Sequence, residues 1–169
     1  RLVPVKNIDM QIRAFARIAR EFPRARLRIV GSGTLNEVLK SQVRSLKLEG
    51  RVVFEGQQEN PARFYQEADA FLLTSDCEGW GVAVVEAAAF GLPIIMTDVG
   101  CAGDFIRNGE SGIVIPVGDA AALTAAMERL ITHEPFRTRL AAAARRAFEA
   151  LPTPEEQIQK QIIAWRALL

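Results

Sequence analysis

Short apolar runs alternate with amphipathic segments along the first two thirds of the chain. Apolar side chains recur every three or four positions between residues 7 and 22, which predicts a helix capped by Asn7 and stopped by Pro23. A second helical pattern covers residues 35–46. The runs that predict short buried strands are residues 27–30, 52–54, 70–73, 93–97 and 112–115. This alternation predicts an α/β fold in which helices cover both faces of a parallel sheet.

The last third of the chain has a different pattern, in which helical segments follow one another without a strand between them. These segments are residues 119–131, 135–150 and 155–169, and we expect them to form a helical C-terminal extension. The last one has a clear start signal, because Thr153 suits the cap, Pro154 the first helical position and Glu156 the reciprocal capping partner. Its apolar stripe consists of Ile158, Ile162, Trp165 and Leu169. Such a stripe is expected to pack against another apolar surface.

Composition narrows the class of protein. A length of 169 residues suits one domain, and the formal net charge is only +1. Domains that bind nucleic acid are usually strongly basic, so we expect no nucleic-acid partner. No apolar stretch approaches the length of a membrane span and no leader precedes the first helix, which favours a cytoplasmic location. Cys77 and Cys101 have no partners at metal-ligand spacing, so no zinc site is expected.

A basic region near the start of the chain leaves two interpretations open. It consists of Arg13, Arg17, Arg20, Arg24, Arg26 and Arg28. The first of these recur at helical spacing, as on the solvated face of an ordinary amphipathic helix. The alternative is peripheral contact with an anionic membrane surface, which would place the protein at the inner face of the membrane.

The residues best suited to chemistry lie in the segment 75–87, directly after a predicted strand. Gly79 and Gly81 allow the backbone to turn sharply from strand to helix. The amides of Gly81 and Val82 would then point outward from a helix N-terminus. Such an end carries roughly half a positive charge and unpaired donors, so it suits a phosphate group.

Glu78 and Glu86 stand on either side of this helix start and could accept hydrogen bonds from sugar and ribose hydroxyls. They are separated by seven residues and followed by Ala-Ala-Ala-Phe-Gly-Leu-Pro at positions 87–93. The pattern resembles the signature of retaining glycosyltransferases of the GT-B fold, in the family also called glycosyltransferases group 1. The similarity extends along nearly all of the chain, at residues 1–7, 30–33, 52–56, 68–70, 97–100 and 108–112.

The resemblance implies a Rossmann-like domain that forms one half of the GT-B fold. Residues 1–169 would then be the domain that binds the nucleotide-sugar donor, lacking its first strand and the N-terminal acceptor domain. Arg1 and Lys6 would grip the donor diphosphate and stabilise the departing nucleoside diphosphate, as cations do where charge develops. Glu78 would contact hydroxyls of the donor sugar, and Glu86 those of the ribose.

The resemblance thus implies Arg1, Lys6 and Glu78 as catalytic residues. The donor-binding residues that it implies are Gly31, Gly33, Gly79, Trp80, Gly81, Val82 and Glu86. The family works without a bound divalent metal, so we expect no metal ligand and no cofactor, the nucleoside diphosphate sugar being a substrate. Many members carry a glutamate where this chain has Asp104, and we assign Asp104 no role.

The expected reaction is transfer of a sugar, of the hexosyltransferase type, to an acceptor hydroxyl with retention. The acceptor would be a sugar or lipid-linked sugar bound by the absent domain, as in polysaccharide or glycolipid biosynthesis, and the fragment alone is expected to be inactive. Three alternatives remain: a nucleotide-sugar epimerase, a phosphorylase of the same fold, and a non-catalytic nucleotide-sugar-binding module. Binding of NAD is not favoured, because Asn36 occupies the position of the third glycine in the dinucleotide fingerprint that would start at Gly31.

Overall fold

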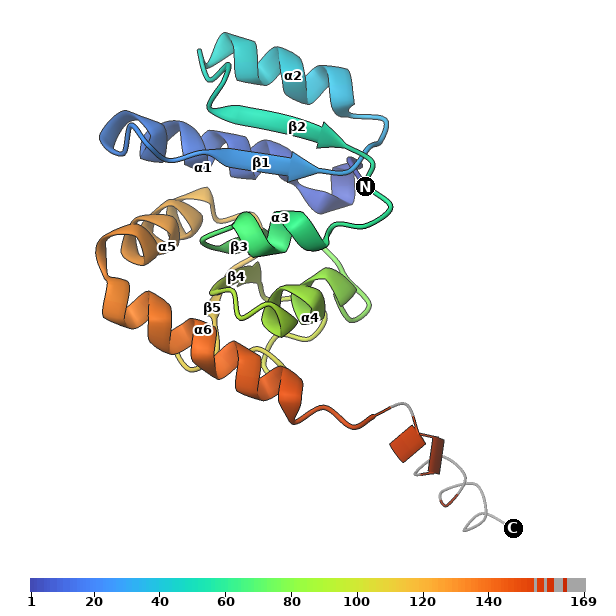
Figure 1. Ribbon diagram of the computed structural model, residues 1–169. Coiled ribbons are helices and arrows are strands. Elements are labelled where there is room, and N and C mark those ends of the chain that lie inside the picture. The colour runs from blue at the N-terminus through green and yellow to red at the C-terminus, as the bar shows by residue number, and fades with distance from the viewer. Residues whose placement is uncertain (154, 157, 160–162, 164–169) are drawn as a thin grey trace.

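The strands of the protein are short, and all of them pair in parallel. A computed structural model describes residues 1–153, 155, 156, 158, 159 and 163 (Figure 1). The strands are β1 (Leu27–Val30), β2 (Val52–Gly56), β3 (Phe71–Leu73), β4 (Ile94–Thr97) and β5 (Ile113–Ile115). Each lies at a predicted apolar run, and the parallel α/β architecture expected from the sequence is confirmed.

Six helices accompany the strands in the described part of the chain. They are α1 (Ile8–Glu21), α2 (Asn36–Ser45), α3 (Ala62–Glu67), α4 (Val82–Ala89), α5 (Ala120–Thr132) and α6 (Glu134–Glu149), and a 3-10 turn η1 (Pro4–Lys6) precedes α1. The helices expected at residues 7–22, 35–46, 119–131 and 135–150 begin and end within one residue of the prediction. Helix α3 was not predicted as a separate element, because its six residues are too few to show a helical period.

Hydrogen bonding divides the strands into two sheets, with the orders β1-β2 and β3-β4-β5. The first residues of the chain connect the two sheets at their carboxyl ends. The amide of Leu2 donates to the carbonyl of Ser32, just after β1, at 2.8 Å, and the amide of Asp76, just after β3, donates to the carbonyl of Val5 at 2.8 Å. One short segment therefore fixes the spacing between the carboxyl edges of the two sheets.

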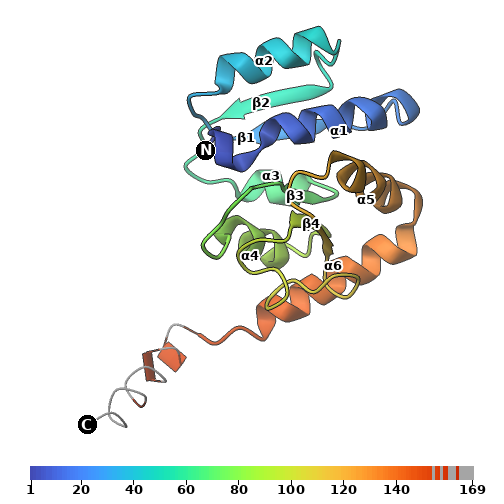
Figure 2. The same cartoon turned by 180° about the vertical axis from the view of Figure 1, so that it is seen from behind.

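Strand β4 is buried on both faces, and its side chains show how the helices are layered. Ile95 belongs to an apolar cluster with residues of α1, α2 and α5, whereas Ile94 and Met96 belong to a second cluster with residues of α4 and α6. Figure 2 shows α1 and α5 side by side, as they also appear in Figure 1. Helices thus cover both faces, as the continuous apolar run at 93–97 predicts.

Helix α3 is tied to the first sheet by a charged side chain. Arg28 of β1 donates to Glu55 of β2 at 2.7 Å and to Glu67 of α3 at 2.6 Å. Its guanidinium also lies 4.7 Å from the centre of the Phe64 ring. A cation over an aromatic face is attracted by the ring quadrupole, so Arg28 holds α3 beside β1 and β2.

The two predicted helix starts have different outcomes. Asn7 does occupy the cap position of α1, but it has a left-handed backbone with φ of 48° and its side chain donates to Asp76 at 3.0 Å instead of capping the helix. At the other end, Thr153 and Glu156 form the expected reciprocal pair, with side-chain to backbone bonds of 2.8 and 3.2 Å. Ile158 is 55% exposed. The other members of its predicted stripe, Ile162, Trp165 and Leu169, lie outside the described residues.

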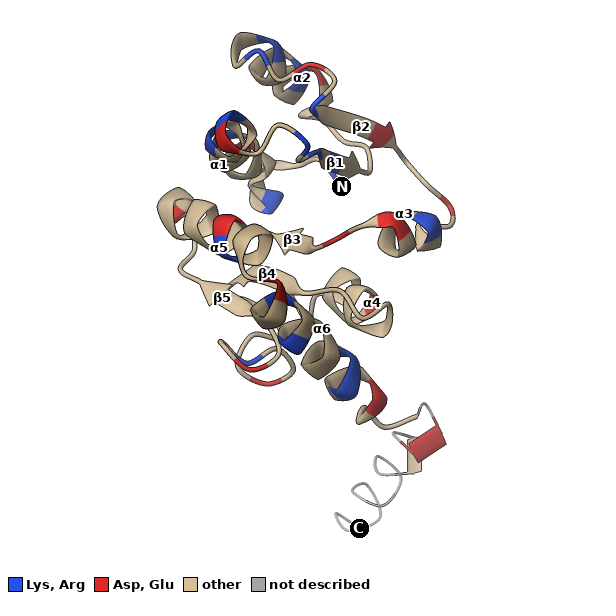
Figure 3. Ribbon diagram, turned by 60° about the vertical axis from the view of Figure 1, so that its left-hand side comes forward, with Lys and Arg blue, Asp and Glu red and all other residues tan. Residues whose placement is uncertain are grey.

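The predicted basic region is solvent-exposed, but it is not uniformly basic. All six of its arginines are exposed, and Figure 3 shows acidic residues on α1 as well as basic ones. Arg13 pairs with Asp9 one turn earlier on this helix. Membrane contact through this region therefore stays a prediction. Among the helices of the described residues, none is long and apolar enough to cross a membrane.

A buried polar bridge between α1 and the end of β3 gives a test of the fold. The Gln11 amide donates to the Thr74 hydroxyl at 2.8 Å, and this hydroxyl lies 3.0 Å from the carbonyl of Lys6, to which it can donate. Thr74→Val leaves the buried Gln11 amide without an acceptor, so we expect a loss of about 1–3 kcal/mol in the free energy of unfolding, measured with urea. The control is Thr124→Val, because Thr124 bonds only to a carbonyl of its own helix. Equal losses in the two variants would contradict this role of Thr74.

Candidate functional site at the carboxyl edge of the strands

Most of the predicted site residues lie on three segments at one edge of the sheets, and the remaining two, Val82 and Glu86, lie on α4, which follows the third segment. These segments are the N-terminal residues 1–6, the turn 31–33 after β1, and the loop 74–81 between β3 and α4. In open α/β folds this carboxyl edge is where ligands bind. The hydrogen bonds from Leu2 and to Val5 bring the N-terminal segment against both of the other segments.

Lys6 and Glu78 form the closest charged contact of this edge. The Lys6 ammonium lies 2.5 Å from Oε1 of Glu78, and the Ser75 hydroxyl donates to the same oxygen at 2.7 Å. The two charged side chains keep only 26% and 12% of their surface exposed, respectively. The structure therefore brings together two residues that the resemblance assigns to different parts of a ligand.

Two opposing effects act on the Glu78 carboxyl. Partial burial raises the pKa of Glu78, but the hydrogen bonds from Lys6 and Ser75 and the charge of Lys6 together outweigh it, and the pKa lies below its ordinary value. Glu78 is consequently ionised at neutral pH. An ionised carboxylate only accepts hydrogen bonds, as contact with sugar hydroxyls requires.

The glycine turn after β1 holds the backbone of the N-terminal segment. Leu2 is buried, and its carbonyl accepts from the amide of Leu35 at 3.1 Å. A Cβ atom on Gly33 would lie 2.3 Å from this carbonyl oxygen, and one on Gly31 would lie 3.6 Å from the backbone nitrogen of Arg1. Gly33 is thus required by a close approach of the Leu2 backbone, and Gly31 lies beside Arg1, whose side chain is exposed.

The start of α4 has the geometry expected of an anion-binding helix end. Gly81 occupies the cap position with φ of 91°, a left-handed conformation that suits glycine, and no side chain caps the helix. The carbonyl of Trp80 accepts from the amide of Cys101 at 3.1 Å, so the loop after β4 supports the loop 74–81. Gly100 lets the two loops approach, because its Cβ would lie 2.9 Å from the Trp80 oxygen. Val82 is exposed at the first helical position.

Glu86 has a partner that the sequence did not identify. It lies on the exposed side of α4, and its Oε2 accepts a hydrogen bond of 2.8 Å from the hydroxyl of Tyr65 on α3. Burial, followed by the contact with Glu86, raises the pKa of Tyr65, which keeps the hydroxyl protonated as the donor. Residues 65 and 86 are far apart in sequence, so no local motif indicates this pairing.

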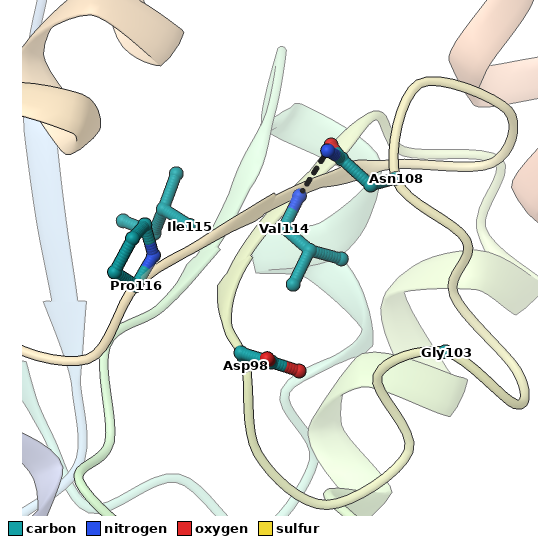
Figure 4. Close-up of a pocket in the computed structure, with 6 residues that line it drawn as sticks. All are labelled: Asp98, Gly103, Asn108, Val114, Ile115 and Pro116. Atoms are coloured by element: carbon teal, nitrogen blue, oxygen red, sulfur yellow. Dashed lines mark hydrogen bonds between the residues drawn. The ribbon is translucent and has the colours of Figure 1, made fainter.

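Two cavities are bordered by the loops that follow β4. One of about 380 Å³ is lined by Asp98, Gly103, Asn108, Val114, Ile115 and Pro116. Figure 4 shows that the Asn108 side chain accepts from the amide of Val114, at 3.0 Å. The other cavity, of about 430 Å³, lies between α6 and the loops around Trp80 and Phe105. Of the predicted site residues, only Trp80 lines either cavity.

No cluster of three or more His, Cys, Asp or Glu side chains placed to hold a metal ion occurs among the residues that the structure describes. The polar groups of the edge include an arginine, a lysine, three carboxylates (Asp76, Glu78 and Glu86), a tyrosine hydroxyl and helix-end amides. Such a set can bind an anion next to a group rich in hydroxyls. The expectation that the site works without a metal ion stays a prediction.

The contact between Lys6 and Glu78 predicts the direction of a pKa change. Lys6→Met removes the ammonium while burial of the carboxyl remains, so we expect the pKa of Glu78 to rise, as followed by carbon-13 NMR of the side-chain carboxyl. The matched control is Lys40→Met, because Lys40 pairs with Glu37 on α2. In the unchanged protein, the stability that Glu78 contributes is present above its unfolded pKa and is lost as pH falls through its lowered folded pKa. If the pKa of Glu78 is unchanged in Lys6→Met, Lys6 is not the cause of the lowered pKa.

Comparison with known proteins yields relatives that share a class of activity. The chain is 33% identical to N-acetyl-alpha-D-glucosaminyl L-malate synthase of Bacillus anthracis over 141 residues, which is 83% of the chain and 37% of that protein. It is 32% identical to the lipopolysaccharide core biosynthesis glycosyltransferase LpsE of Rhizobium meliloti, over 83% of the chain and 40% of the relative. The chain therefore spans about two fifths of the length of these relatives.

Solved structures have the same fold. Sucrose-phosphate synthase from Thermosynechococcus elongatus matches with a TM-score of 0.86 and 27% identity, over 99% of the chain and 43% of the synthase. The pneumococcal O-GlcNAc transferase GtfA, solved in complex with UDP and GlcNAc, matches with a TM-score of 0.86 and 25% identity, over 99% of the chain and 34% of the transferase. These neighbours confirm the α/β fold of GT-B glycosyltransferases.

The family described as glycosyl transferases group 1 matches residues 1–147. The match includes the N-terminal segment, the glycine turn and the loop with Glu78, as well as Glu86 on α4. The chain belongs to the glycosyl transferases group 1 family.

Proposed function

We propose that this chain is the nucleotide-sugar-binding domain of a retaining glycosyltransferase, which moves a sugar from a nucleoside diphosphate sugar to an acceptor hydroxyl. The observation that carries the proposal is the contact of Lys6 with Glu78 beside the uncapped N-terminus of α4. A cation and helix-end amides suit a diphosphate, and an adjacent carboxylate suits the hydroxyls of the attached sugar. The membership of the family, and the UDP and GlcNAc bound to GtfA, support this choice of ligand.

The residues of the site would act on the leaving group. The donor diphosphate would lie against the amides of Gly81 and Val82, with the ammonium of Lys6 and the guanidinium of Arg1 beside it. Negative charge accumulates on this diphosphate as its bond to the sugar breaks, so fixed cations and amides stabilise the transition state more than the ground state. Glu78, held ionised by Lys6 and Ser75, would orient the sugar by accepting from its hydroxyls.

The proposed enzyme has a second domain that binds the acceptor. The share of two related proteins that the chain spans, 37% and 40%, supports this organisation. Within the present domain, β1 and β3 each have one strand neighbour in the described part of the chain. A further strand between β1 and β3 would join the two sheets into one. The second domain would bind the acceptor, and the present chain would bind the nucleotide and its sugar.

Nucleotide binding is the direct test of the proposed site. Titration of the folded chain with UDP, GDP and ADP, followed by calorimetry, is expected to show saturable binding of at least one of them. Glu86→Ala removes a charged acceptor for the ribose hydroxyls and is expected to weaken binding of that nucleotide by roughly 10- to 100-fold.

The control for this titration is Glu37→Ala, because Glu37 is an exposed carboxylate on α2 with its own lysine partner. This variant is expected to bind like the unchanged chain. The absence of saturable binding for all three nucleotides would refute the proposed function. Binding unaffected by Glu86→Ala would remove only the role of Glu86.

Reaction products distinguish sugar transfer from the other activities of this fold. The full-length protein, supplied with a nucleoside diphosphate sugar and a mixture of acceptors, is expected to give a glycosylated acceptor with the anomeric configuration of the donor, as read by proton NMR. An epimerised donor would indicate an epimerase, and a sugar phosphate released from a glycan by inorganic phosphate would indicate a phosphorylase. Binding without turnover would indicate a non-catalytic module.

A further inference from the structure

Among the residues that the structure describes, Tyr65 is the one whose side chain forms a hydrogen bond with Glu86. The donor is Oη of Tyr65 on α3, and the acceptor is Oε2 of Glu86 on α4, at 2.8 Å. Tyr65 is partly buried, whereas Glu86 is exposed. The contact therefore joins a fixed donor to a carboxylate on the surface.

The ring of Tyr65 is itself held by two aromatic neighbours. It stacks on Phe90 with 5.4 Å between ring centres and an angle of 18°, and it lies 6.0 Å from the ring of Phe71 at 47°. Phe90 comes one helical turn after Glu86, so the ring packs on the same exposed side of α4 that carries the carboxylate. The tyrosine hydroxyl thus approaches Glu86 from a defined direction.

An exposed glutamate without such a contact samples many rotamers. Ordering a long, rotamer-rich side chain costs roughly 1–2 kcal/mol, which a ligand must supply if the protein has not already done so. Because Tyr65 occupies Oε2, the other oxygen, Oε1, is left in a defined position. Two neighbouring hydroxyls of one ligand can donate to a carboxylate oxygen, since each oxygen has two lone pairs.

We propose that Tyr65 is a positioning residue that orders Glu86 for the vicinal hydroxyls of a ribose, and so makes the site selective for ribonucleotides. This inference rests on the proposed function, because it takes Glu86 as the residue that contacts the ribose. Tyr65 itself does not touch the nucleotide. Its effect on binding should therefore exist only when both the Glu86 carboxylate and the ribose hydroxyls are present.

The experiment compares a ribonucleoside diphosphate with its 2′,3′-dideoxy analogue, using the base that the unchanged chain binds. The variants are Tyr65→Phe, Glu86→Ala and the two combined. Tyr65→Phe keeps the ring and its stacking on Phe90 and removes only the hydroxyl. We expect it to weaken binding of the ribonucleotide by roughly 3- to 10-fold and to leave the affinity for the dideoxy analogue unchanged.

In the Glu86→Ala background, Tyr65→Phe is expected to change neither affinity. An equal loss for both nucleotides, or a loss that persists without Glu86, would overturn the positioning role and indicate a general structural effect of Tyr65. Unchanged ribonucleotide affinity in Tyr65→Phe would overturn it as well.

The failure of this inference is distinct from failure of the proposed function. If Glu86→Ala weakens binding of the ribonucleotide and Tyr65→Phe does not, the proposed site is retained and only the role of Tyr65 is refuted. If the unchanged chain binds no nucleoside diphosphate, both the proposed function and the role of Tyr65 are refuted.

Thermal unfolding of each variant checks that it is folded. Phe90→Leu, which weakens the stacking on Tyr65 and keeps the hydroxyl, is expected to give a smaller loss of selectivity than Tyr65→Phe.

Discussion

The site depends on one partly buried ion pair between Lys6 and Glu78. Charges that leave water are stable only when each has a partner, and here the carboxylate has both an ammonium and the Ser75 hydroxyl. Lys6 can make this contact because the backbone around it is tied to both sheets: Leu2 donates to Ser32 just after β1, and Val5 accepts from Asp76 just after β3. The path of the first six residues therefore places the ammonium that keeps Glu78 ionised. Glu78 of this pair lies three residues before Gly81, the cap residue of α4, so the pair and the uncapped helix end belong to one loop.

Much of the fold could be predicted from the sequence, because its determinants are local. Apolar runs located all five strands, and helical periodicity located four of the described helices. The reciprocal pairing of Thr153 with Glu156 was also readable, since it depends on residues three positions apart. Three features could not be predicted: the division into two sheets, the short helix α3 and the use of the Asn7 side chain on Asp76. Each depends on contacts between segments that are distant in sequence, or on an element too short to show a period.

The same distinction holds for the candidate site. The glycines and the two glutamates were visible as a motif, and so was their relation to a helix start. Gly33 and Gly81 have the close approach and the left-handed backbone, respectively, for which glycine is suited. The pairing of Lys6 with Glu78 spans 72 positions and that of Tyr65 with Glu86 spans 21, so no spacing rule could reveal them. The motif thus shows which residues the candidate site contains, and the tertiary structure determines which of them are in contact.

The attachment of α3 has a mechanical consequence. Arg28 binds this helix to the first sheet through Glu67, and Tyr65 binds it to α4, which packs on the second sheet. A change in the distance between the sheets must therefore stretch one of these two attachments. If the attachment at Arg28 holds, the strain reaches the Glu86 carboxylate, and under the proposed function a rearrangement between the sheets would weaken the contact of Glu86 with the ribose hydroxyls.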